Sequence, residues 1–164
     1  KDTSFDKISV TFYEDTYSLY NLYRFAHYYE EAYGKYIWLK SGASLVIEHT
    51  EAMTVIDVNT GSVLKKKRQE DTLFYQINRE AAKEIARQIR LRNISGIIMI
   101  DFINMKDEKQ KEKLLLLLEN ECRKDRIHCN VVDMTALNLV EMTRSKVRRP
   151  LLEQITVCRK MQKN

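Results

Sequence analysis

The stretch AMTVIDVNTG, residues 52–61, places one acidic side chain, Asp57, at the end of an apolar run that has the composition of a buried strand. Asn59 and a glycine follow shortly afterwards, and both residue types favour turns. The same arrangement returns 44 residues later in SGIIMIDFINM, residues 95–105, where Asp101 takes the corresponding place. If the two strands are neighbours in a sheet, both carboxylates lie near one edge of it.

The sequence around these stretches predicts an α/β (α+β) fold, a mixed sheet with covering helices. Residues 45–50 and 53–58 are separated by a short turn and predict an antiparallel hairpin. A stripe of isoleucine and alanine with a spacing of four predicts an amphipathic helix at about 77–89. The continuous apolar segment 96–102 is typical of a strand buried on both faces. Further strands are expected at 5–13, 35–39, 127–134 and 137–143, further helices at 16–33 and 106–125, and a loop at 62–71.

The composition fits one domain, or one domain with part of a neighbour, in a chain of 164 residues. Lys and Arg number 28 against 23 Asp and Glu, and this net charge of +5 is compatible with a polyanionic partner. There is no apolar run long enough for a membrane span, and the first residues show no signal peptide. Three cysteines without a CxxC pair favour a reducing, cytoplasmic location. The first residue is Lys rather than Met, which suggests a piece of a longer chain.

Asp57 and Asp101 are candidate ligands of a divalent cation if their strands are neighbours. Two carboxylates that close repel each other unless a cation or a proton lies between them. Mg²⁺, with Mn²⁺ as a possible substitute, suits such oxygen ligands and keeps several waters. Asn59 could add an oxygen ligand or hold the first carboxylate in place. The alternative is that both acids only cap the turns that follow them.

Basic residues are candidates for contacts to phosphate groups. They occur in the stretch KKKR, residues 65–68, and in RSKVRR, residues 144–149. The alternative is a solvated, charged loop. The tyrosines of the segment 16–33 could stack on bases, but core packing or plain surface exposure is the favoured explanation. Neither a nucleophile paired with a base nor a glycine-rich phosphate loop is recognisable. The individual candidates are Lys65, Lys66, Lys67, Arg68, Arg144 and Lys146.

Three stretches together resemble the catalytic region of the ribonuclease E/G family. They are SGASLVIEHTEAMTVIDVNTG, INREAAKEIARQIRLRNISGIIMIDFINM and LVEMTRSKVRRPL. The resemblance implies a deoxyribonuclease-I-like catalytic subdomain at 41–152, preceded at 1–40 by part of a ribonuclease-H-like subdomain.

The same resemblance implies roles for individual residues. Asp57 and Asp101 match the two aspartates that hold Mg²⁺ in this family, and Asn59 matches the asparagine that supports the first of them. Arg144 matches an arginine of the family's EMTR motif and would contact the RNA backbone. Its alternative role is a salt bridge to Glu141 or to another carboxylate. The implied reaction is hydrolysis of single-stranded RNA, with 5′-phosphate and 3′-hydroxyl products.

Two features depart from the family pattern. The family's amino-terminal oligonucleotide-binding domain with its 5′-phosphate sensor is absent from the sequence. In the tail, 153–164, Cys158 matches the first thiolate of the family's CPxC zinc link, but Met161 stands at the second position. One thiolate per chain cannot complete a four-thiolate site between two chains, so zinc is not expected, and a homo-oligomer would lack this link.

The sequence therefore predicts a metal-dependent endoribonuclease domain for single-stranded RNA. The alternatives are a non-catalytic RNA-binding or assembly module that keeps the fold, and a phosphodiesterase for another nucleic acid.

Overall fold

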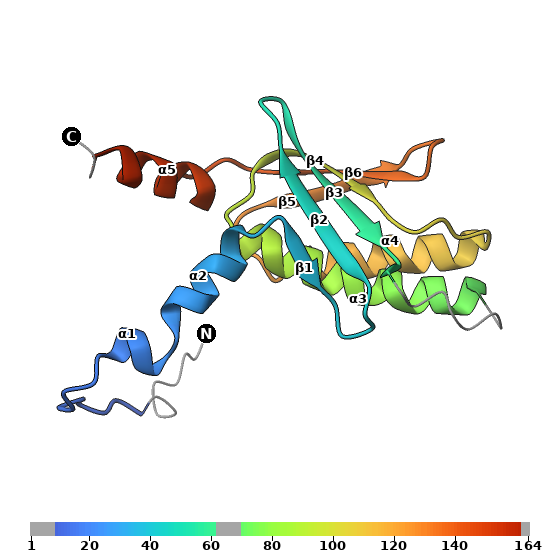
Figure 1. Ribbon diagram of the computed structural model, residues 1–164. Helices are drawn as coiled ribbons and strands as arrows, with labels where there is room; N and C mark the ends of the chain where they lie inside the picture. Colours follow the sequence, from blue (N-terminus) through green and yellow to red (C-terminus); the bar gives the residue numbers. More distant parts are fainter. Residues whose placement is uncertain (1–8, 62–69, 162–164) are drawn as a thin grey trace.

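A computed structural model describes residues 9–61 and 70–161 of the chain, which form one six-stranded mixed sheet with helices (Figure 1). The strand order is β1-β2-β3-β4-β6-β5. The strands are β1 (Tyr36–Trp38), β2 (Ser44–His49), β3 (Met53–Asn59), β4 (Gly96–Asp101), β5 (Cys129–Met134) and β6 (Leu139–Arg144), and the helices are α1 (Leu19–Leu22), α2 (Phe25–Tyr33), α3 (Glu70–Leu91), α4 (Glu108–Cys122) and α5 (Leu151–Met161).

The sheet combines antiparallel hairpins with one parallel pair. β2 and β3 form the predicted hairpin, whose turn is closed by the Thr50 hydroxyl: it donates to the Met53 carbonyl at 2.8 Å and accepts from the Met53 amide at 3.0 Å. β3 and β4 are parallel because the long helix α3 returns the chain to the starting end of the sheet. β6 is antiparallel to both β4 and β5. The order of elements from β2 to β6 is the one that the sequence predicts.

The core lies between one face of the sheet and the helices α3 and α4, which run side by side along that face (Figure 1). The predicted stripe of α3 is confirmed, since its isoleucines and alanines are at most 1% exposed. Burial of each large aliphatic side chain contributes about 1.5–3 kcal/mol, so this contact holds the helices to the sheet. The central contributors are Ile77, Ala81, Ile85 and Ile89 from α3, Leu114 and Leu118 from α4, and Ile56, Ile98, Ile100, Val140 and Met142 from the sheet.

The prediction that β4 is buried on both faces is wrong. Ile98 and Ile100 are fully buried, but Ile97, near the start of the strand, is 48% exposed. The reason is that, in the described part of the chain, α3 and α4 cover one face of the sheet, and Ile97, Met99 and Asp101 point to the opposite side. We call that opposite side the open face. Its members on the central strands are Ser44, Val46, Glu48, Met53, Val55, Asp57, Asn59, Ile97, Met99, Asp101, Leu139, Glu141 and Thr143.

The structure also corrects two predictions for the amino-terminal part. Residues 9–13 are not a strand, and residues 1–8 lie outside the described residues. The helix predicted at 16–33 is divided into α1 and α2 by Arg24, whose φ of 50° is left-handed. None of the residues of α1 is buried, so tertiary packing does not hold the aromatic segment in one continuous helix. Gly34 ends α2 as predicted.

Gly61 is required where the chain leaves β3. Its φ is +58°, and a Cβ there would lie 2.7 Å from the carbonyl oxygen of Gly42, in the turn between β1 and β2. The glycine thus lets two backbone segments approach closely beside the end of β3. Among the described residues, none of the helices has both the length and the apolar character needed to cross a bilayer.

Candidate active site

The two strand-ending aspartates lie directly opposite each other. In the parallel pair of β3 and β4, the register aligns Asp57 with Asp101. The buried neighbours Ile56 and Ile100 face the helices, so both carboxylates project from the open face. Adjacent strands are about 4.8 Å apart, which places the two backbones within reach of a single bound ion. The sheet therefore brings together two acids that are separated by 44 residues of sequence.

Asn59 supports the first carboxylate. Its Nδ2 atom donates a hydrogen bond of 2.7 Å to Oδ2 of Asp57. The contact follows from strand geometry, because side chains two positions apart project from the same face. An amide that holds one carboxylate oxygen fixes the side chain's orientation and leaves the other oxygen for a further partner.

The electrostatics of the pair favour a shared cation. The pKa of Asp101 is raised, first because partial burial disfavours its charged form and second because the charge of Asp57 repels it. Among the described residues, no group of three or more His, Cys, Asp or Glu side chains forms a potential metal site. Mg²⁺ is commonly bound through one or two carboxylates with waters completing its octahedron. The chemistry of Asp57 and Asp101 therefore fits Mg²⁺, and not a dedicated cage of protein ligands.

Asn78 is a residue near the site that the sequence analysis did not find. It lies on α3, is fully buried, and clamps the backbone just after β4. Its Nδ2 donates to the Ile103 carbonyl at 2.7 Å, and its Oδ1 accepts from the Ile103 amide at 3.0 Å. Both backbone groups lie two residues beyond Asp101, so Asn78 is a positioning residue. The feature of the sequence that could have indicated its role is a single asparagine at an otherwise apolar position of this helix.

Replacing Asn78 tests this clamp. We expect Asn78→Ala to lower the free energy of unfolding by about 3 kcal/mol, since it leaves two backbone polar groups without partners. Urea unfolding would measure the loss. Asn78→Asp is the matched control, because its carboxylate can accept from the Ile103 amide but cannot donate to the carbonyl. A loss in Asn78→Ala below about 0.5 kcal/mol would contradict the proposed clamp.

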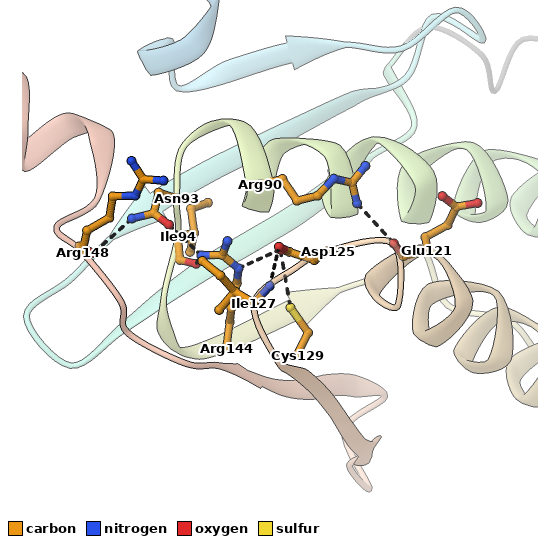
Figure 2. A network of polar contacts seen from close by, with 9 residues as sticks. All are labelled: Arg90, Asn93, Ile94, Glu121, Asp125, Ile127, Cys129, Arg144 and Arg148. Carbon is orange, nitrogen blue, oxygen red and sulfur yellow. Dashed lines mark hydrogen bonds and ion pairs between the residues drawn. The ribbon is translucent and has the colours of Figure 1, made fainter. Parts of the chain in front are cut away.

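Arg144 belongs to a buried polar network and not to the carboxylate pair (Figure 2). Its guanidinium donates to Asp125 at 2.9 Å, to Oδ1 of Asn93 at 2.9 Å and to the Ile94 carbonyl at 2.9 Å. The Arg144 and Asp125 side chains are only 3% and 7% exposed. The structure thus shows a salt bridge to a carboxylate other than Glu141, namely Asp125. The contact of Arg144 to the RNA backbone stays a prediction.

The same network joins four parts of the chain. Asp125 also accepts from the Ile127 amide at 3.0 Å, and Asn93 donates to the Arg148 carbonyl (Figure 2). Asn93 donates to the Arg149 carbonyl as well. It therefore connects the end of α3, the α4–β5 loop, β6 and the segment before α5.

Among the described residues, the basic candidates Arg144 and Lys146 are not close to the carboxylates. Arg144 pairs with Gly96, at the opposite end of β4 from Asp101, a separation of five residues or about 17 Å. Lys146 is exposed two residues beyond Arg144, at that same far end. Lys65, Lys66, Lys67 and Arg68 lie outside the described residues, as does most of the predicted loop 62–71. Cys158 lies on α5.

Comparison with known proteins connects this geometry to a family. The Ribonuclease E/G family matches residues 2–147. The chain is 42% identical to Ribonuclease G of Escherichia coli strain K12 over 133 residues, which are 81% of this chain and 27% of the relative. It is 42% identical to Ribonuclease G of Haemophilus influenzae over 85% of this chain and 28% of the relative. It is also 42% identical to Ribonuclease E of Nostoc sp. over 70% of this chain and 17% of the relative.

The chain thus spans little more than a quarter of the length of the two Ribonuclease G relatives and 17% of Ribonuclease E of Nostoc sp.. The match nevertheless includes both strands that carry the aspartates, and it covers most of this chain. The chain belongs to the Ribonuclease E/G family.

Proposed function

We propose that this chain carries the catalytic region of a metal-dependent endoribonuclease that hydrolyses single-stranded RNA. The observation that carries the proposal is the register of Asp57 with Asp101 on neighbouring parallel strands, with Asn59 bonded to Asp57. Membership of a family whose matched relatives are named ribonucleases supports the reaction class. Single-stranded RNA as the substrate, the metal and the activity of this region alone are parts of the proposal.

Asp57 and Asp101 would hold Mg²⁺ at the open face. The chemistry that a divalent cation would supply there is polarisation of a phosphodiester, activation of a water and compensation of transition-state charge. Asn59 keeps the Asp57 carboxylate in one orientation, and Asn78 fixes the backbone that follows Asp101. The chain's own part is therefore to present two oriented carboxylates on the sheet, which is held in place because Ile56, Ile98 and Ile100 of β3 and β4 are buried in the core behind it.

Cleavage assays with matched strands test the proposal. A labelled, unstructured RNA and a DNA of the same sequence would be incubated with the protein and Mg²⁺, Mn²⁺ or a chelator. We expect cutting of the RNA with either metal, none with the chelator, and 5′-phosphate ends on the products. Equal cutting of both strands would favour the more general phosphodiesterase. Cutting that survives the chelator would refute the metal-dependent mechanism.

A non-catalytic RNA-binding or assembly module is the second candidate. The observation in its favour is that Arg144 is turned inward and Lys146 lies at the far end of the sheet, so neither helps to hold RNA at the carboxylates. RNA retardation in a gel without cleavage in any metal would support this candidate.

The other predictions stay parts of the proposal. They are the subdomain division near residues 40 and 152, a cytoplasmic location, and an oligomer, if one forms, without a zinc link at Cys158.

A further inference from the structure

Two exposed aromatic side chains lie on the open face, on the edge strand β1. Tyr36 is 59% exposed and Trp38 is 73% exposed, whereas Ile37 between them is buried against the helices. Both rings therefore project from the same side of the sheet. A tryptophan usually buries most of its large surface, so an exposed one on a rigid strand is unusual. Its indole face is available to a flat, polarisable partner.

The sheet register connects these rings to the carboxylate pair. Tyr36 pairs with Val46, Val46 pairs with Asp57, and Asp57 pairs with Asp101. Tyr36 and the two acids therefore lie in one row across the open face. In the next row of this face, Trp38 pairs with Ser44, which pairs with Asn59. One strand lies between β1 and β3. The backbone of Tyr36 is therefore about 10 Å from that of Asp57, and the backbone of Trp38 is about 10 Å from that of Asn59.

We propose that Trp38, with Tyr36 beside it, is a stacking platform for a base of single-stranded RNA next to the phosphodiester held at Asp57 and Asp101. The proposal rests on the proposed function and adds how the strand is held. Stacking on an aromatic ring tolerates any base, because every base has a π-face. A rigid edge strand would fix the base relative to the carboxylates, which is the positioning that hydrolysis of one bond requires.

The charges around β1 suit a polyanion. Lys35 lies 5.7 Å from the centre of the Tyr36 ring, and Lys40 is exposed two residues beyond Trp38. Lys35 is partly neutralised by its ion pair with Glu48. The acids of the open face repel RNA phosphates until a cation occupies the pair. RNA should therefore bind to the unsubstituted protein more tightly with Mg²⁺ than without it. When both aspartates are replaced by asparagine, RNA binding should no longer depend on Mg²⁺.

The fluorescence of Trp38 gives a direct test, because the chain contains one tryptophan. An unstructured oligoadenylate would be titrated into the Asp57→Asn/Asp101→Asn protein without metal, where no cleavage occurs. We expect saturable quenching, which an abasic ribose-phosphate strand of equal length does not produce. Absent quenching, or equal quenching by the abasic strand, would overturn the platform. An emission change on dilution without RNA would instead assign this surface to a second copy of the chain.

Substitutions provide the second test. We expect Trp38→Ala to raise KM for RNA cleavage about ten-fold with little change in kcat, the size of one lost stacking contact. Trp38→Phe should recover most of this loss. Phe12→Ala is the matched control, since Phe12 is 84% exposed but precedes α1 and lies outside the sheet. An unchanged KM in Trp38→Ala, or a loss confined to kcat, would contradict the proposal.

The two proposals fail in different ways. If the region does not cleave RNA, the same ten-fold weakening is expected in the Kd for RNA, measured by fluorescence anisotropy. RNA binding that depends on Trp38 without cleavage would refute the proposed enzyme and keep the platform. Cleavage with the same KM in the unsubstituted protein and in Trp38→Ala would support the proposed enzyme and refute the platform.

Discussion

Asp57→Asn and Asp101→Asn are each expected to reduce RNA cleavage by at least about 10³-fold. Charge stabilisation by a bound metal supplies several kcal/mol of the catalytic effect, and either substitution removes one of the two carboxylates that would hold it. The measurement is the initial rate of cutting of a labelled RNA at saturating Mg²⁺. The fold should persist, because both acids lie on the open face, away from the packed core.

Direct metal binding separates this role from other causes of inactivity. Calorimetry should show Mg²⁺ or Mn²⁺ binding to the unsubstituted protein and its loss in both variants. Glu141→Gln is the matched control: it removes one negative charge from the same face, but Glu141 is opposite Met99 and not opposite either aspartate. Full cleavage activity in both aspartate variants would end the assignment of this site.

Breaking the buried pair of Arg144 and Asp125 is expected to have the largest effect on stability. Asp125→Asn should lower the free energy of unfolding by about 3–5 kcal/mol, because it leaves the Arg144 guanidinium charged and buried without its counterion. Chemical denaturation at pH 7 would measure the loss. Lys111 and Glu108 form a comparable but more exposed pair, in which the Glu108 side chain is 77% exposed. Glu108→Gln is therefore the control and should cost less than about 1 kcal/mol.

The pH dependence of stability provides a second measurement on the same pair. Burial would raise the pKa of Asp125, but its hydrogen bonds from Arg144 and the Ile127 amide and the charge of Arg144 outweigh this effect and lower it. A lowered folded-state pKa means that the stabilisation is complete above the unfolded value of about 4 and is lost as the pH falls through the folded value. The difference between the unsubstituted protein and Asp125→Asn should therefore shrink from pH 7 to pH 3. A constant difference would show that the Asp125 charge is not responsible.

The sequence predicted the central part of the fold because local patterns determine it. The hairpin of β2 and β3, the stripe of α3 and the order of elements from β2 to β6 all follow from hydrophobic periodicity and turn residues. Periodicity failed where packing decides. The apolar run of β4 does not indicate whether other elements cover one face of the strand or both. The aromatic segment before Gly34 has the composition of a helix, but it lacks the contacts that would keep the helix continuous.

The candidate site, like the fold, was predicted from the sequence in part and depends on tertiary structure for the rest. The sequence by itself predicted the candidate residues, since Asp57, Asn59 and Asp101 stand near strand ends and match the family pattern. Only the tertiary structure decided that the two aspartates lie side by side, because a parallel register depends on the crossover through α3. It also turned Arg144 inward to Asp125, a partner 19 residues away. Charge alone could not predict that direction, since a guanidinium binds a phosphate and a carboxylate by the same donors.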